Sequence, residues 1–401
     1  MISGITTLLF TGSLFVFISL KYFYVPFILI FTIFFIVFSY LAYITKETIK
    51  KSIYFNIAFF FFLVGGFEIH SYQVIMEHNK KRKTNKNFVT HEGSYSKEYF
   101  VTNEILGYSI KKDIQANSIK KIKDTLVYDV IYTIGKDGNR ITPEPKSHNN
   151  DKCMIFFGCS ITFGEGVSDS SSLPFIVGEL QNNKVHNYGC HGYGPHQMLA
   201  AIENKMITCN SNSVIYQTFT DHVYRAAGYF SWDFHGPKYN IKNGDLFFDG
   251  HFDDFKTNKV FTLYDKLYNQ RFKSYTYRRL FLTHYKYDIT EYDINRYLTI
   301  VEQSRTLLKN KNPEVNFHVI IWDFFPKSYK SQWTLSKIIN GFKQKSIDYH
   351  LVSNILPEFL ENTGINYTKM YQILNDGHPN QNAYRLIAKY VVNKIYNGTP
   401  S

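Results

Sequence analysis

Long apolar runs fill the first 70 residues of the chain. Ile5–Leu20 and Tyr22–Ile44 contain almost no charge, and Ile53–Ile69 is nearly as apolar. A helix needs about 20 apolar residues to cross the hydrocarbon core of a bilayer, so the second run is long enough and the other two are at the short end. The pattern predicts a membrane anchor of three transmembrane helices over residues 1–72, with membrane lipid as a partner. Buried core helices of a soluble protein are the alternative.

Basic residues flank the apolar runs on both sides. Lys46, Lys50 and Lys51 lie between the second and third runs, and the positive-inside rule then places the long C-terminal part outside the cytoplasm. The basic stretch at 80–86 argues for the opposite orientation. We expect a multi-pass membrane protein whose C-terminal part is extracytoplasmic.

Residues 73–150 have a different pattern. Val74–Asn87 is polar and basic, which suits a connector. Val127–Ile134 alternates in polarity and predicts a strand, and Asp137-Gly138 is a hairpin turn signal before Arg140–Thr142. The region is therefore predicted to be a basic connector followed by a small β-rich lead-in.

From residue 151 to the C-terminus, short apolar runs alternate with helical patterns. This alternation predicts an α/β domain with a parallel sheet covered by helices. Apolar residues recur at helical spacing between Ile294 and Leu308, and a last helix is predicted from about Pro379. Residues 226–292 form an insertion rich in aromatic residues. The candidate strands are Cys153–Phe157, Lys184–Asn187, Val214–Phe219, Asn316–Trp322 and Tyr349–Ser353.

Charge and cysteine content narrow the possible partners. The formal charge is +12, but the basic residues are scattered or close to the apolar runs, so we expect no nucleic-acid partner. The four cysteines lack both metal-ligand spacing and the density of a disulfide scaffold, and they are predicted to be buried thiols. His191 and His196 are not accompanied by a ligand set at metal-site spacing, so no metal and no cofactor are predicted.

Two separated segments carry candidate chemistry. Ser160 follows the first predicted strand between Gly158 and Gly164, where a turn would expose its hydroxyl at the carboxyl edge of the sheet. Asp376 and His378 lie near the C-terminus. A serine, a histidine and an acid are the parts of a nucleophile, its general base and an orienting group. Capping of the following helix is the alternative function of the serine.

Three ordered segments resemble the motifs of the SGNH, or GDSL, hydrolases. Gly158–Thr162 is similar to the first motif, with Cys159 where aspartate is usual; Asn187–Gly194 resembles the second; and Asp376–Asn380 resembles the last. The resemblance implies a three-layer α/β/α, flavodoxin-like domain in which Ser160 is the nucleophile, His378 the base and Asp376 its partner. One residue separates Asp376 from His378, whereas the family usually has two.

The same resemblance implies an oxyanion hole built from the backbone amides of Ser160 and Gly192 and from an asparagine side chain. If Asp221 matches the aspartate that follows this asparagine, Thr220 occupies the asparagine position. Asp221 and His222 are then expected to line the substrate pocket, while a structural ion pair in this loop is the alternative.

These inferences predict a serine esterase that acts on an acyl ester, with an acetyl ester of a glycan or of a related small substrate as the expected substrate. The aromatic insertion could stack on sugar rings or simply pack over the core. Transfer of the acyl group to another hydroxyl would use the same intermediate, so an O-acyltransferase is the first alternative. A membrane-tethered glycan-binding protein with weak catalysis is the second.

Overall fold

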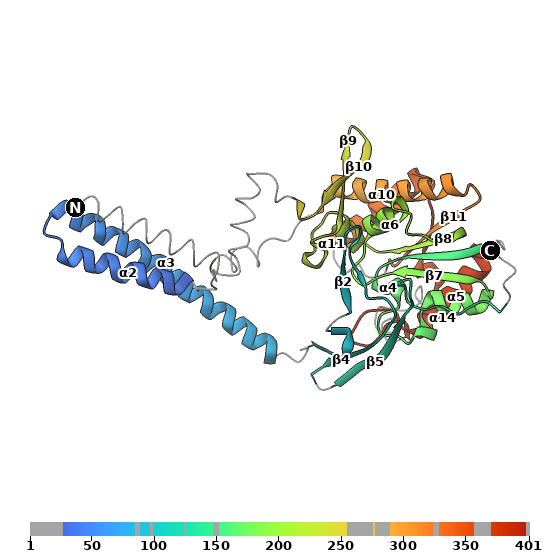
Figure 1. The fold of residues 1–401 in the computed structure, drawn as a ribbon, viewed down its shortest axis with the longest axis horizontal. Coiled ribbons are helices and arrows are strands. Elements are labelled where there is room, and N and C mark those ends of the chain that lie inside the picture. The colour runs from blue at the N-terminus through green and yellow to red at the C-terminus, as the bar shows by residue number, and fades with distance from the viewer. Residues whose placement is uncertain are drawn as a thin grey trace. The chain divides into compact units, whose positions relative to one another are not determined.

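The computed structural model describes residues 27–84, 89–96, 99–123, 125–146, 152–254, 276, 289–323, 329–356 and 370–397. These residues form two compact units. The first contains the apolar helices α2 and α3. The second spans Val89–Asp254 and Asp288–Ser401 and contains every described strand (Figure 1).

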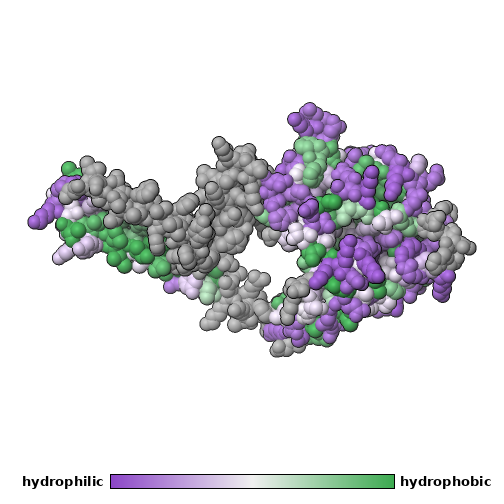
Figure 2. Space-filling model, viewed as in Figure 1, coloured by the Kyte–Doolittle hydropathy of each residue, from purple (hydrophilic) through white to green (hydrophobic). Residues whose placement is uncertain are grey.

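The apolar unit is a pair of helices, α2 (Phe27–Ile44) and α3 (Thr48–Thr84). Phe61 of α3 packs against phenylalanines of α2, with its ring centroid 4.9 Å from that of Phe34. Many large apolar side chains on these helices still face outward, and Phe67 is 65% exposed. Figure 2 shows these apolar side chains gathered on the surface of the helices.

Within the described residues, one helical segment, Thr48–Glu77, is long and apolar enough to cross a membrane, and the apolar segment Leu29–Ile44 is shorter. The predicted span Ile5–Leu20 lies outside the described residues. A multi-pass arrangement is therefore not supported. The predicted connector over Val74–Asn87 is helical for most of its length, because α3 continues to Thr84.

The lead-in is rich in β-structure. β1 (Val89–Glu92), β4 (Ile114–Ile122) and β5 (Thr125–Ile134) form an antiparallel sheet in the order β1-β4-β5. A second antiparallel pair contains β2 (Phe100–Asn103) and β3 (Gly107–Ile110). The predicted strand lies within β5, but the main partner of β5 is β4, which the sequence pattern did not reveal.

Arg140 joins the lead-in to the α/β region. Its backbone bridges Ile134 on one side and Asn187 on the other, so the turn after β5 meets an edge strand of the large sheet. The side chain is 1% exposed and its guanidinium donates hydrogen bonds to the carbonyl oxygens of Phe163, Gly164 and Val167.

The centre of the second unit is a five-stranded sheet whose neighbours all pair in parallel. The strand order β12-β11-β8-β6-β7 is the flavodoxin-like order, in which the chain changes direction between β6 and β8. All five predicted strands are confirmed. Their bounds are β6 (Lys152–Gly158), β7 (Lys184–Gly189), β8 (Asn210–Thr218), β11 (Asn316–Ile321) and β12 (Asp348–Leu351).

Helices cover both faces of this sheet because successive side chains of a strand point to opposite faces. In β6, Met154 and Phe156 belong to one apolar core and Ile155 and Phe157 to the other. α5 and α14 pack together on the first face, and α6, α7 and α10 pack together on the second. The helices are α4 (Ser160–Phe163), α5 (Leu173–Gln181), α6 (Pro195–Glu203), α7 (Asp221–Ala226), α10 (Glu291–Lys311), α11 (Tyr329–Gln344), α12 (Val352–Ile355), α14 (Gln381–Tyr390) and the π-helix Val391–Tyr396, with 3₁₀ turns at Ser94–Ser96, Asp169–Ser171 and Ser231–Asp233.

The described part of the aromatic insertion contains the hairpin β9 (Pro237–Lys242) and β10 (Asp245–His251). Asn243 and Gly244 form its turn with φ of 53° and 94°. Positive φ at both central turn residues is the reason for an Asn-Gly pair at this point.

The prediction that all four cysteines are free thiols is wrong for two of them. Cys153 and Cys209 form a disulfide, while Cys159 and Cys190 are free and buried. The bonded pair is 56 residues apart in sequence. The two cysteines come together because β6 and β8 are parallel neighbours. Lys152 lies opposite Asn210, so the amino ends of the two strands are side by side.

Candidate active site

Ser160 lies on a sharp turn between β6 and α4. Gly158 has a φ of 151°, and a Cβ at this position would lie 2.2 Å from Thr162 Oγ1 and 2.8 Å from the carbonyl oxygen of Gln217. Only glycine fits such a close approach. The turn therefore brings the serine hydroxyl to the carboxyl end of β6, beside the point where the strand order reverses.

Asp376 and His378 come from another tight turn, just before α14. The amide of Asp376 donates to the carbonyl oxygen of Ile373, and the amide of Ile373 donates to the carbonyl oxygen of His378. Gly377 has a φ of 96°. The reversal lets Asp376 Oδ1 accept from the backbone N–H of His378 at 3.0 Å and also meet the ring Nδ1 at 2.5 Å. A single intervening residue is thus sufficient for the Asp–His contact.

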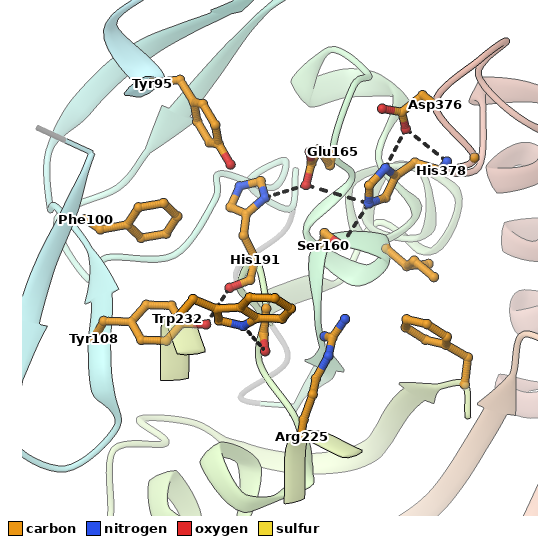
Figure 3. A pocket seen from close by; sticks show the side chains of 14 residues that line it. Tyr95, Phe100, Tyr108, Ser160, Glu165, His191, Arg225, Trp232, Asp376 and His378 are labelled. Atoms are coloured by element: carbon orange, nitrogen blue, oxygen red, sulfur yellow. Dashed lines mark hydrogen bonds and ion pairs between the residues drawn. The ribbon is translucent and has the colours of Figure 1, made fainter. Parts of the chain in front are cut away.

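The two turns are in contact, although 218 residues of sequence separate Ser160 from His378. His378 Nε2 lies 2.9 Å from Ser160 Oγ (Figure 3). With Nδ1–H donated to the carboxylate, Nε2 of a neutral imidazole is free to accept the serine proton. Three of the predicted site residues are therefore brought together in the order Ser160, His378, Asp376.

Charges around the triad favour the imidazolium form of His378. Burial alone would lower the pKa of His378, but Glu165, then Asp376, outweigh burial and the opposing charge of Lys120, so the pKa is raised. Burial alone would raise the pKa of Asp376, but the hydrogen bond with His378 and the ion pair with Lys120 hold it well below its usual range. The aspartate thus remains ionised beside the ring.

A second carboxylate and a second imidazole adjoin the triad. Glu165 Oε2 lies 2.7 Å from His191 Nδ1 and 3.6 Å from His378 Nε2 (Figure 3). Burial opposes ionisation of Glu165, but the two histidines prevail and lower its pKa to about 2. His191 Nε2 lies 3.4 Å from the hydroxyl of Tyr99. The carboxylate therefore has an imidazole on either side.

Ser160 and His378 open into a cavity of about 700 Å³. One wall is aromatic and contains Tyr95, Phe100, Tyr108 and Trp232 (Figure 3). Trp232 comes from the predicted insertion, whereas the other three come from the lead-in. A pocket of this size with an apolar wall and a few polar groups is typical of a small-molecule site.

Gly192 lines the same cavity and has a φ of 80°. A Cβ at this position would lie 2.6 Å from both Trp232 Nε1 and Tyr108 Oη, so a side chain would displace the aromatic wall. Among the described residues, no acceptor is found for the backbone N–H of Ser160 or of Gly192. Both amides are available to a ligand oxygen.

The other three predicted site residues are not brought to the described lining of this cavity. Thr220 and His222 are buried, and the ring Nδ1 of His222 lies 2.6 Å from Tyr216 Oη in the core. Asp221 begins α7 but also lies outside the lining. The turn of α7 instead directs Arg225 to the cavity, together with Phe219 at the end of the preceding segment.

One cluster among the described residues has the proximity of a metal site. Cys153, His186 and Cys209 place their ligand atoms within 4.8 Å of one another. The two sulfur atoms are bonded to each other, so they cannot act as thiolate ligands in this form. His196 is occupied differently, with its Nε2 2.6 Å from Asp233 Oδ2 in the buried interior.

Comparisons with known proteins identify neighbours only among solved structures. No family model and no curated protein matches the chain. An acetyl xylan esterase from the rumen bacterium Butyrivibrio proteoclasticus is 12% identical, with a TM-score of 0.32, and the match covers 71% of this chain and 68% of that one. A family two carbohydrate esterase from Clostridium thermocellum is 10% identical, with a TM-score of 0.35 and coverages of 67% and 70%.

A mutant of an acetyl-xylooligosaccharide esterase from Geobacillus Stearmophilus is 12% identical to this chain, with a TM-score of 0.34 and coverages of 61% and 94%. All three neighbours are named as esterases. The scores are too low to carry an argument, so the chemistry of this site is inferred from its own geometry.

Proposed function

We propose that this protein is a serine esterase that hydrolyses an acyl ester through an intermediate on Ser160. The observation that supports this most strongly is the 2.9 Å contact between Ser160 Oγ and His378 Nε2, with Asp376 on the other ring nitrogen. A serine hydroxyl is a weak nucleophile until a base removes its proton. The contact supplies such a base, and the ionised aspartate stabilises the imidazolium that forms.

The reaction has two steps. Ser160 Oγ adds to the ester carbonyl carbon while its proton passes to His378 Nε2, and the carbonyl oxygen becomes an oxyanion. The carbon–oxygen bond to the alcohol then breaks, and His378 returns the proton to the leaving alcohol. Water attacks the resulting acyl-serine in the same way, which releases the acid and restores Ser160.

The aromatic wall supports a glycan as the alcohol part of the ester. Tyr95, Phe100, Tyr108 and Trp232 offer flat apolar surfaces in the same cavity as the nucleophile. Aromatic rings provide large contact area, and Tyr and Trp add a polar group at one end. A sugar ring has an apolar face and a hydroxylated edge, so it suits this wall, and an acetyl group is small enough to reach Ser160.

Ser160→Ala tests the nucleophile. We expect the variant to lose release of acetate from acetylated sugars and to lose labelling by a fluorophosphonate, because the attacking oxygen is gone. Ser170→Ala removes an exposed hydroxyl from the neighbouring 3₁₀ turn and should leave both signals unchanged. Labelling or turnover that persists in Ser160→Ala would show that another residue is the nucleophile.

We further propose that α3 anchors the protein in a membrane. The second unit, which carries Ser160 and is called the esterase unit below, would then lie on the oxidising, extracytoplasmic side of that membrane. The exposed phenylalanines of α3 support the anchor, and the disulfide between Cys153 and Cys209 supports the orientation, since disulfides persist outside the reducing cytosol. Protease added to sealed cells should digest the esterase unit. Digestion only after lysis would place this unit in the cytoplasm.

A further inference from the structure

The three buried arginines of the esterase unit differ in how their charge is balanced. Arg140 pairs with Asp169 at 2.7 Å, and Arg296 pairs with Asp293 at 3.4 Å. Arg225 is only 7% exposed, yet no carboxylate among the described residues forms an ion pair with it. An arginine keeps its charge in proteins, and a buried charge without a counter-ion is costly. Among the described residues, Arg225 is therefore a buried cation that no direct ion pair offsets.

The contacts of Arg225 fix its position but leave part of its donor set unused. Nη1 donates to the carbonyl oxygen of Tyr193 at 2.7 Å, and the guanidinium carbon lies 5.2 Å from the ring centre of Phe219. The Nε atom is buried and has no partner among the described groups. Burial raises the pKa of Asp221, and the charge of Arg225 opposes this from a distance, without a direct ion pair between the two side chains.

The position of Arg225 is on the same side of the site as the free amides. Its anchor, the carbonyl of Tyr193, directly follows Gly192, whose N–H faces no acceptor among the described residues. Arg225, Gly192 and Ser160 all line the same cavity. Figure 3 shows the Arg225 side chain pointing from α7 toward the part of the cavity that contains Ser160.

We propose that Arg225 is the charged donor of the oxyanion hole and occupies the place that an asparagine side chain has in the SGNH family. This inference rests on the proposed esterase function. When Ser160 Oγ bonds to the carbonyl carbon, the electron pair of the carbonyl π bond moves to oxygen, and the serine proton goes to His378. Arg225 and the amides of Ser160 and Gly192 stabilise that negative oxygen until the alcohol leaves and the carbonyl re-forms.

A guanidinium suits this task because its charge acts mainly on the transition state. The ester carbonyl is neutral before attack, so the cation gains most of its stabilisation as the oxyanion develops. The arrangement also explains why Thr220 is not needed in the cavity. The oxyanion would supply the direct negative partner that Arg225 lacks among the described residues.

The test compares two esters, neutral 4-nitrophenyl acetate and a 4-nitrophenyl ester of succinate that carries a carboxylate. The first step is to show that the wild type hydrolyses the esters and that Ser160→Ala does not. A failure of the proposed esterase function is thereby distinguished from a failure of the proposal for Arg225. Arg225→Met should then lower kcat for both esters by about a hundredfold to a thousandfold, the usual cost of one oxyanion donor, with KM little changed.

Arg296→Met is the matched control. Arg296 is also a buried arginine close to α7, but it does not belong to the lining of the cavity. It should change kcat much less than Arg225→Met does. Arg225→Gln keeps a donor for the carbonyl of Tyr193 and decides the outcome if the methionine variant does not fold, as judged by circular dichroism. It too should lose kcat for both esters, since the charge is gone.

Two results would overturn the proposal. One is an unchanged kcat for 4-nitrophenyl acetate in a folded Arg225 variant. The other is a rise in KM confined to the succinate ester, which would show that Arg225 binds an anionic group of the substrate and not the oxyanion.

Discussion

The second unit contains two carboxylate–histidine pairs that share one cavity but have different surroundings. In the first pair, Asp376 Oδ1 lies 2.5 Å from His378 Nδ1. In the second pair, Glu165 Oε2 lies 2.7 Å from His191 Nδ1. The second imidazole is enclosed by aromatic rings, with the ring centroid of Phe163 only 4.2 Å away. The first reaches a serine hydroxyl with its other nitrogen.

This difference shows that a carboxylate partner alone does not make a histidine a candidate general base. A reactive hydroxyl within hydrogen-bond reach is the additional requirement. Within the described parts of the chain, His191 Nε2 has only the phenol of Tyr99 within reach, at 3.4 Å. A third pair, His196 and Asp233, is wholly buried and serves the packing of α6 against the insertion.

The largest expected contrast comes from removing each imidazole in turn. His378→Gln should lower kcat by on the order of a hundredfold to ten-thousandfold, because the serine loses its general base. His191→Gln retains a polar group toward Glu165, and its kcat should fall by less than about tenfold, a change of ~1.4 kcal/mol in the barrier. Steady-state kinetics on an acetyl ester measures both.

Equal losses in the two variants would contradict the comparison, since His191 would then take part in the proton transfer. Fluorophosphonate labelling of the folded His191→Gln variant gives an independent check, and it should proceed at nearly the wild-type rate.

A smaller effect is expected on the pH dependence, because Glu165 links the two pairs. His378 acts as a base only when it is neutral. Its pKa is raised, so kcat/KM of the wild type should fall on the acid side with a midpoint above 6.5. The facing groups are Glu165 and Asp376, which raise this pKa, and Lys120, which lowers it.

Glu165→Gln removes one of the raising charges, so the midpoint should move to lower pH. Glu179→Gln on the exposed side of α5 is the control and should leave the midpoint in place. A midpoint that does not move in Glu165→Gln would mean that the glutamate does not act on His378.

The sheet was largely predictable from sequence because its signal is local. Each strand is a short apolar run between turn residues, and parallel strands buried on both faces give such runs. The three catalytic candidates were predictable for a related reason. Each lies in a compact motif with a glycine within two residues, and the turns require the backbone geometry of Gly158 and Gly377.

The rest of the site depends on contacts between distant segments. Tyr95, Phe100 and Tyr108 belong to the lead-in, and no spacing in the sequence relates them to Ser160. Glu165 acquires its function only through two histidines far along the chain. The disulfide was missed for the same reason, because strand order and not cysteine spacing brings Cys153 to Cys209.

The segment around α7 shows the limit of motif transfer. The family pattern predicts that Thr220, Asp221 and His222 belong to the site, because they follow the third strand. The structure instead brings Arg225 to the cavity, one helical turn beyond Asp221.

The hydrogen bonds of Arg140 have a practical consequence for work on this protein. Its guanidinium supplies the donors for the carbonyl oxygens of Phe163, Gly164 and Val167, directly after the nucleophile turn. A shortened chain that begins at residue 151 would remove these three hydrogen bonds. The oxygens of Phe163 and Gly164 would keep only long contacts of 3.4 Å, with Asn187 Nδ2 and the amide of Val167, and the oxygen of Val167 would lose its donor, a penalty of about 1–3 kcal/mol. Truncations for crystallisation should therefore begin before residue 89 and keep the lead-in with the sheet.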